Sequence, residues 1–191
     1  EDLLKSELKS NRFFALRKLD DLDIEIDIII IAVGTPSNNN GDIDLSFIKN
    51  ASKNIAHYIK EVKNHVSIVV KSTVLPGTTD TLIKNILEKE SSKKLGEFGL
   101  GMNPEFLREG NAIYDFLNAD RIIIGWEDEK TKIRLENLYK PWTCEKITVN
   151  TRTAEFIKYT NNCFLALQVS TTNEIANLAY EVGGVDIQEI M

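Results

Sequence analysis

Asp27-Ile28-Ile29-Ile30-Ile31-Ala32-Val33 is the stretch that decides the fold class of this chain. A short run of β-branched residues that does not alternate with polar positions is typical of a strand buried on both faces. Four similar runs follow it, at residues 66–70, 98–102, 121–124 and 146–149. The sequence therefore predicts a sheet built from these runs.

Helical patterns lie between the predicted strands. One apolar face recurs at three- or four-residue spacing over residues 45–62, which indicates an amphipathic helix. A second helix is predicted over residues 78–90, and a third over about 127–139, before Pro141. Alternating strands and helices favour parallel pairing, so we expect an α/β fold with a partial Rossmann-like, doubly wound parallel sheet.

After residue 150 the pattern changes to one long helix. Residues 151–182 contain neither Pro nor Gly, and Gly183-Gly184 ends the run. At ~1.5 Å per residue this helix is roughly 45–50 Å long, and its apolar residues cover more than one face. We expect it to link this domain to another and to pack in a subunit interface. The alternative is a core helix of a monomer.

Bulk properties exclude several classes of protein. The 191 residues are 42% hydrophobic and 27% charged, which suits one compact soluble domain, or one domain and part of another. The net charge is −6 with both signs interspersed, so nucleic acid is not expected as a partner. The longest apolar run is too short for a membrane span, and no secretory signal pattern is present. Cys144 and Cys163 lack metal-ligand spacing, so we expect no metal and a cytoplasmic protein.

The two ends suggest a piece of a longer protein. The chain begins at Glu1 rather than at Met, and it stops at Met191. Asp186 and Glu189 have the spacing of a helix N-cap and an acidic third position, so a helix begins just before the last residue. We therefore expect this chain to be a fragment.

Polar residues follow the first three predicted strands. These segments are Gly34-Thr35-Pro36-Ser37, Lys71-Ser72-Thr73 and Asn103-Pro104-Glu105. Parallel strands end at one edge of a sheet, which is where open α/β sheets bind ligands, so Thr35, Thr73 and Glu105 are predicted to line one crevice. For each position alone, the alternative is a turn or a helix cap.

A second polar set lies on the long helix. Lys158 and Asn162 are four residues apart and face the same way, among largely apolar neighbours. A buried lysine is costly unless it has a partner or a task. The alternative is that Lys158 pairs with Glu155 at the surface.

Together, several segments resemble the UDP-glucose/GDP-mannose dehydrogenase family over nearly the whole chain. The full run Asn103-Pro104-Glu105-Phe106-Leu107-Arg108-Glu109-Gly110, followed by Asp120-Arg121, is most similar to the UDP-glucose 6-dehydrogenase branch. The other markers are Val33-Gly34-Thr35-Pro36, Gly41-Asp42-Ile43-Asp44-Leu45-Ser46, Lys71-Ser72-Thr73-Val74, Asp115-Phe116, Ala154-Glu155-Phe156-Ile157-Lys158-Tyr159, Asn162 and Asn173-Glu174.

The resemblance implies an oxidoreductase that converts the C6 hydroxyl of UDP-glucose to the carboxylate of UDP-glucuronate, using two NAD+. An aldehyde, a cysteine thiohemiacetal and a thioester are the implied intermediates. Residues 1–150 would be a partial NAD-binding Rossmann-like domain without its first βαβ unit. Residues 151–191 would begin a central helical domain, with homodimerisation through residues 151–182. The alternatives are activity on GDP-mannose or a UDP-N-acetylhexosamine, or a non-catalytic Rossmann-like dimerisation module.

The resemblance also implies roles for the matched residues. Thr73 would lie beside the reacting carbon, Glu105 would transfer protons or place the hydrolytic water, Lys158 would stabilise negative charge on the C6 oxygen, and Asn162 would hydrogen-bond the same region. Glu109 would contact the nicotinamide. Cofactor contacts would come from Val33, Gly34, Thr35, Pro36, Ser72, Thr73 and Glu109. Substrate contacts would come from Glu105, Phe106, Leu107, Arg108, Glu109, Lys158 and Asn162.

The chain also departs from the family pattern. The Gly-x-Gly turn that holds the pyrophosphate and the nucleophilic cysteine of the family are not found in these residues, and neither Cys144 nor Cys163 can replace that cysteine. Gln168 stands where many relatives carry Lys. In the 3-2-1-4-5-6 strand order, residues 12–14 would be a third strand without its neighbour. We therefore expect residues 1–20 to be poorly packed or paired with another chain, and residues 27–33 to form a bare sheet edge.

Overall fold

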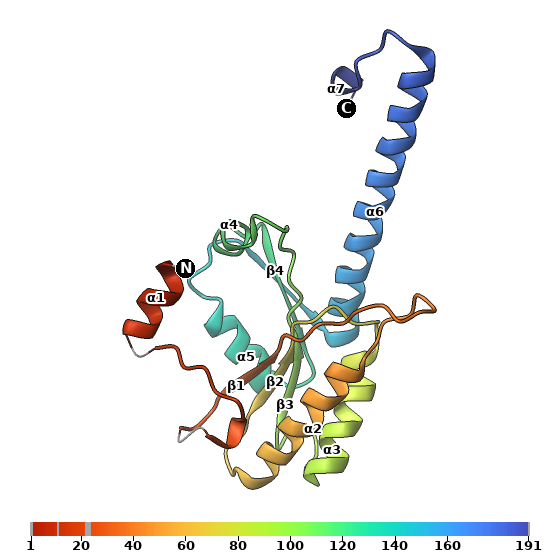
Figure 1. Cartoon of the computed structure of the whole chain (residues 1–191). Coiled ribbons are helices and arrows are strands. Elements are labelled where there is room, and N and C mark those ends of the chain that lie inside the picture. The colour runs from red at the N-terminus through yellow and green to blue at the C-terminus, as the bar shows by residue number, and fades with distance from the viewer. Residues whose placement is uncertain (1, 11, 22–23, 191) are drawn as a thin grey trace.

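The computed structural model describes residues 2–10, 12–21 and 24–190 (Figure 1). Its centre is one sheet with strand order β1-β2-β3-β4-β5. The strands are β1 (Ile28–Ile31), β2 (Ser67–Val70), β3 (Gly99–Met102), β4 (Arg121–Trp126) and β5 (Glu145–Asn150). All five lie within the predicted runs or extend them by one or two residues, so the strand predictions and the α/β class are confirmed.

Helices cover both faces of the sheet. On one side lie α2 (Ser46–Glu61) and α3 (Lys84–Ser91), and on the other lies α5 (Glu129–Leu138) (Figure 1). Successive side chains of β2 point to opposite faces of the sheet. Ile68 and Val70 belong to the core under α2 and α3, whereas Val69 belongs to the core that contains Leu135 of α5. The doubly wound architecture is therefore confirmed. The predicted helix over 78–90 is divided, since it begins as a π-helical segment, η2 (Thr78–Ile83), and continues as α3.

The expectation of parallel pairing is wrong at one place. β4 runs antiparallel to β3, with Gly101 opposite Trp126 and Met102 opposite Gly125, whereas the other pairs are parallel. A parallel connection needs a crossover that spans the sheet, usually a helix. The connection here holds only α4 (Ala112–Leu117), six residues and about 9 Å long, with no buried residue. The chain therefore turns back, and β4 extends beyond the carboxyl end of β3.

The N-terminal segment lies beside the sheet and not in it. It contains α1 (Asp2–Lys9), which the sequence did not predict, and a short 3-10 turn, η1 (Leu19–Asp21). Residues 12–14 are exposed and belong to no strand. β1 is the outermost strand, so one of its edges has no partner among the described residues. Both findings confirm the expectation for residues 12–14 and for the bare edge.

The long helix α6 (Thr151–Val182) has the predicted bounds and points away from the sheet towards α7 (Ile187–Ile190) (Figure 1). The side chain of Asn150 caps it by accepting the Thr153 N–H at 2.8 Å. Its buried residues are Thr151, Ala154, Glu155, Lys158 and Ala179. Large apolar side chains beyond the first turns are exposed, as at Phe164 (62%) and Leu167 (61%). Beyond its first turns, most of α6 is therefore not packed against the rest of the described residues, and whether it lies in a subunit interface or in the core of a monomer stays a prediction.

In the part of the chain that the structure describes, no helix has the length and apolar character needed to cross a membrane.

Candidate functional site

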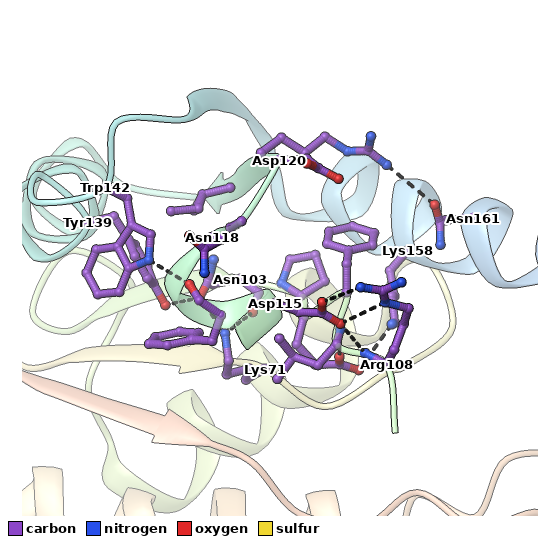
Figure 2. A pocket seen from close by; sticks show the side chains of 18 of the residues that line it. Lys71, Asn103, Arg108, Asp115, Asn118, Asp120, Tyr139, Trp142, Lys158 and Asn161 are labelled. Carbon is purple, nitrogen blue, oxygen red and sulfur yellow. Dashed lines mark hydrogen bonds and ion pairs between the residues drawn. The ribbon is translucent and has the colours of Figure 1, made fainter. Parts of the chain in front are cut away.

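A cavity of about 560 Å³ opens at the carboxyl edge of the sheet, between the segment after β3, the start of β4 and the first turns of α6 (Figure 2). Because β4 extends past the end of β3, its first residues form one wall of this cavity. The lining residues are Lys71, Asn103, Pro104, Glu105, Phe106, Leu107, Arg108, Tyr114, Asp115, Phe116, Asn118, Ala119, Asp120, Arg121, Ile122, Tyr139, Trp142, Lys158, Asn161, Asn162 and Leu165.

Asn103 anchors the segment that enters the cavity. Its side chain is 2% exposed, and its Oδ1 accepts hydrogen bonds from Lys71 Nζ at 3.0 Å and from Tyr139 Oη at 2.5 Å. Its Nδ2 donates to the carbonyl oxygen of Ile123 at 2.8 Å. Figure 2 shows Lys71 and Tyr139 meeting at this amide from two sides. The Asn103 side chain thus connects the end of β3 to β4, to Tyr139 directly after α5 and to Lys71 directly after β2. It therefore holds the backbone two residues before Glu105.

Glu105 and Lys158 form an ion pair inside the cavity. The Lys158 Nζ lies 3.1 Å from Glu105 Oε1, and Glu105 Oε2 accepts the Leu107 N–H at 2.6 Å. Lys158 is 6% exposed, and its Nζ lies 5.2 Å from the ring centre of Phe106. The structure thus brings together Glu105 and Lys158, which the family resemblance assigned separate roles at the reacting C6 group. A buried ammonium is stabilised here by a carboxylate and by the face of an aromatic ring.

Glu155 does not pair with Lys158, so that alternative is wrong. Glu155 is fully buried, and its carboxylate accepts the Gly77 N–H at 2.5 Å and the Thr79 N–H at 2.7 Å. Burial raises the pKa of Glu155, and the two backbone donors oppose this rise. The sequence carried no signal for this contact, because the partners lie more than 70 positions away.

Lys71 also lines the cavity, although its motif after the second strand indicated no role for its side chain. Its Nζ lines the same cavity as Glu105 and Lys158. Burial lowers the pKa of Lys71, the negative charge of Glu105 opposes this change, and the positive charge of Lys158 adds to it. Burial also raises the pKa of the Tyr139 phenol. The Lys71 ammonium and the Tyr139 hydroxyl are therefore both partly shielded from water where they donate hydrogen bonds to Asn103.

The outer wall carries a second ion pair. Arg108 Nη2 lies 2.7 Å from Asp115 Oδ1, and its backbone N–H and Nε also bond to the other oxygen of Asp115. These hydrogen bonds lower the pKa of Asp115 to about 2. Arg121 lies over Phe106, with its guanidinium carbon 5.2 Å from the ring centre. Trp142 packs edge-on against Phe116 and against Tyr139. The wall thus combines fixed cations with aromatic faces.

Other predicted site residues lie outside this cavity. Thr35, Thr73 and Glu109 are not among its lining residues, so a shared crevice of Thr35 and Thr73 with Glu105 stays a prediction. Glu109 is exposed, whereas Asn162 lines the cavity.

The ends of β1 and β2 lie side by side at the same carboxyl edge of the sheet. The Ser72 hydroxyl accepts the Val33 N–H at 2.9 Å and donates to the Val33 carbonyl at 2.7 Å, so it joins the two strand ends. Pro36 and Gly34 are exposed, and a Cβ at Gly34 would meet no atom within 4 Å.

The cysteines do not take part in the cavity. Cys144 is half-buried, and Cys163 is exposed on α6. Neither residue lines the cavity.

Comparison with known proteins assigns both parts of the chain to one family. Residues 1–143 match the UDP-glucose/GDP-mannose dehydrogenase family, NAD binding domain, and residues 152–191 match the central domain of the same family.

Individual relatives include proteins with two different substrates in their names. A GDP-mannose 6-dehydrogenase of Pseudomonas aeruginosa is 39% identical over 192 residues, covering 100% of this chain and 44% of that protein. The UDP-glucose 6-dehydrogenase YwqF of Bacillus subtilis is 44% identical over 166 residues, covering 87% and 36%. A crystal structure of a ternary complex of Pseudomonas aeruginosa GDP-mannose dehydrogenase superposes with a TM-score of 0.96 at 39% identity, over 100% of this chain and 44% of that one. The chain thus spans less than half the length of these relatives.

Proposed function

The chain belongs to the UDP-glucose/GDP-mannose dehydrogenase family, and from that premise we propose that it carries the Glu105–Lys158 part of an active site that oxidises the C6 hydroxyl of UDP-glucose to a carboxylate. The reaction would proceed in two NAD+-dependent steps. The observation that carries the proposal is the buried ion pair, 3.1 Å between Lys158 Nζ and Glu105 Oε1, in the cavity at the carboxyl edge of the sheet.

The residues at the ends of β1 and β2 fit a dinucleotide cofactor. Gly34 leaves open space, and Thr35 beside it offers a hydroxyl at the sheet edge. The Ser72 hydroxyl already bonds to Val33, so Ser72 would shape this edge more than contact the cofactor through its side chain. Bound NAD+ would accept the hydride that the substrate loses. Val33, Gly34, Thr35 and Pro36 would hold it, with Thr73 and Glu109 on the nicotinamide side.

The ion pair offers a fixed cation and a base, two groups that would assist removal of the hydroxyl proton. Lys158 is a fixed, nearly buried cation, which would stabilise negative charge that develops on the C6 oxygen. Glu105 lies within hydrogen-bond distance of it and would accept a proton or position the hydrolytic water. Asn162 lies one helical turn after Lys158 and lines the same cavity, so it would hydrogen-bond the sugar. Residues 106–108 would contact the substrate as part of the same wall.

UDP-glucose is proposed because the run of residues 103–110 has the form typical of that branch. GDP-mannose and UDP-N-acetylhexosamines are the competing substrates, and relatives named for GDP-mannose are among the similar proteins. The exposed apolar side chains of α6 support a homodimer through this helix, as at Leu165 (55%) and Val169 (54%). The same exposed apolar side chains would also fit the alternative of a non-catalytic dimerisation module, which would show no enzymatic turnover.

The test is to express the complete reading frame that contains this chain and to follow NADH formation with UDP-glucose, GDP-mannose and UDP-N-acetylmannosamine. We expect turnover with UDP-glucose. In that protein Lys158→Ala should lower kcat by about 10²–10³-fold, the cost of losing one preorganised donor to the reacting oxygen. The control is Lys130→Ala, an exposed lysine on α5. A near-normal kcat for folded Lys158→Ala would refute the role of Lys158, and absence of turnover with every sugar nucleotide would refute the enzyme assignment.

Dimerisation is tested separately, by light scattering on the purified protein. We expect a mass of two subunits, and Phe164→Glu, which places a carboxylate on the exposed apolar side of α6, should shift the mass to one subunit. A wild-type monomer across the micromolar range would contradict the interface.

A further inference from the structure

The first turns of α6 are the part of this helix that packs against the sheet. The buried residues Thr151, Ala154, Glu155 and Lys158 recur at intervals of three or four, which places them on one side of the helix. Figure 1 shows α6 meeting the sheet at these turns and then leaving it. Lys158 is the last buried residue of this stripe, so its position depends on how the preceding turn is held.

Glu155 holds that turn through polar contacts. Its two carboxylate oxygens accept the N–H groups of Gly77 and Thr79 at 2.5 and 2.7 Å, at the start of η2. These are N–H groups that the first turn of a helix leaves without a partner inside the helix. Glu155 is 0% exposed, so these bonds are shielded from water, and charged hydrogen bonds of this kind are among the stronger ones in proteins.

Two neighbouring contacts support the same junction. Arg152 pairs with Asp80 at 2.8 Å, and its guanidinium lies over Gly77, 3.6–3.7 Å from where a Cβ would be. On the other side, Gly125 of β4 lets the helix approach closely, since a Cβ there would lie 2.7 Å from the Ala154 Cβ. The helix is therefore held between β4 and the start of η2, and Glu155 is its buried polar anchor.

We propose that Glu155 is a positioning residue that fixes α6 on the segment at residues 77–79 and thereby presents Lys158 to Glu105. This inference rests on the proposed function only for its kinetic consequence. Glu155 and Lys158 are three residues apart on one side of the helix, so a rotation or shift that breaks the Glu155 bonds moves Lys158 with it. Misplacing a reacting group by about 1 Å costs on the order of 10²-fold in rate. Residues 77–79, which Glu155 binds, come shortly after Thr73 in the chain. The Glu155 carboxylate therefore links the proposed cofactor side of the site to the helix that carries Lys158.

The first experiment needs no catalysis and uses this chain. Glu155→Gln keeps the side-chain volume but replaces one acceptor with an NH₂ group that faces a backbone N–H. We expect amide hydrogen exchange at Gly77 and Thr79 to accelerate, and reductive methylation of Lys158, read by mass spectrometry, to rise about tenfold or more as the turn opens. The matched control is Glu181→Gln, an exposed glutamate on the same helix, which should change neither. If the Gly77 and Thr79 amides exchange faster while Lys158 stays as protected as in the wild type, Glu155 only caps η2 and the proposal is wrong.

A second measurement covers the case in which Glu155→Gln does not fold. In the wild-type chain, exchange at Gly77 and Thr79 and methylation of Lys158 should show the same dependence on urea, because one opening exposes all three. Different dependences would overturn the proposal.

The kinetic arm uses the complete reading frame. Glu155→Gln should lower kcat by about 10–10²-fold, with the KM for the sugar nucleotide changed less than kcat. An unchanged kcat in a protein whose Lys158 has become reactive would overturn the positioning role. Absence of turnover in the wild-type protein would instead refute the proposed function, and the exchange and methylation results would still decide the structural claim.

Discussion

Removal of the Asn103 side chain is the sharpest test of how the site is built. Asn103→Ala deletes three hydrogen bonds at once, to Lys71 Nζ, to Tyr139 Oη and from Nδ2 to the Ile123 carbonyl. Tyr139 is 4% exposed and Ile123 is fully buried, so the hydroxyl and the carbonyl would remain in the interior without partners.

The magnitude follows from these two stranded groups. Each buried polar group without a partner costs ~1–3 kcal/mol, so the pair costs ~2–6 kcal/mol. Lys71 is only partly buried and reaches the cavity, where water replaces its lost bond, so it adds little. We expect a loss of about 4 kcal/mol in the free energy of unfolding, a large share of the ~5–15 kcal/mol that holds a domain together.

The assay is urea unfolding followed by circular dichroism, with Asn137→Ala on α5 as the exposed control. A double-mutant cycle with Tyr139→Phe isolates the mechanism. Because Tyr139→Phe removes the hydroxyl that Asn103→Ala would strand, the double variant should lose about 1–2 kcal/mol less than the sum of the single variants. A loss below about 1 kcal/mol for Asn103→Ala, or additivity of the two variants, would refute the account of Asn103 as the anchor of this segment.

Three further outcomes follow from the sheet and the cavity wall. Gly99→Ala should lose about 3 kcal/mol or more in urea unfolding, since its Cβ would lie 1.9 Å from Thr131 Oγ1, whereas Gly34→Ala should change stability by less than about 0.5 kcal/mol because nothing lies near it. The pKa of His65 is lowered, first by burial and then by Lys130 and Arg134, against the opposing charge of Asp128. As the pH falls, the His65 imidazole is therefore protonated in the unfolded chain before it is protonated in the folded protein. Stability that is present above about pH 6.5 should be lost as the pH drops towards the folded pKa of His65. His65→Gln should flatten this part of a curve of stability against pH. A carboxyl NMR titration should find Asp115 with a pKa of about 2, and Arg108→Gln should return it towards its ordinary value; an unchanged titration would contradict the Arg108 hydrogen bonds as its cause.

Local sequence patterns were sufficient where one segment carries its own signal. The Ile-rich run of β1 is a strand, and the stretch without Pro or Gly after Asn150 is one helix that ends at Val182, as predicted. Short elements with weak periodicity, α1 and α4, were missed, since one or two turns give too few residues to establish a repeat.

Part of the site was also open to sequence reasoning. The sequence placed Glu105 after a predicted strand and indicated that Lys158 on the long helix needs a partner or a task, and the structure shows that the two residues pair. The first three strands are parallel, as the expected crevice requires, but Thr35 and Thr73 do not line this cavity, one wall of which comes from the antiparallel β4.

The sequence by itself thus determined the strands, the long helix and the residue types that face the sheet edge, because hydrophobic periodicity is a local property of the chain. Only the tertiary structure decided which distant groups meet: Glu155 with the N–H groups of Gly77 and Thr79, and Asn103 with Lys71 and Tyr139. The physical reason is that a buried polar group takes whatever partner the packed elements bring to it, and that choice depends on the sheet order and the helix approach, which no single segment encodes.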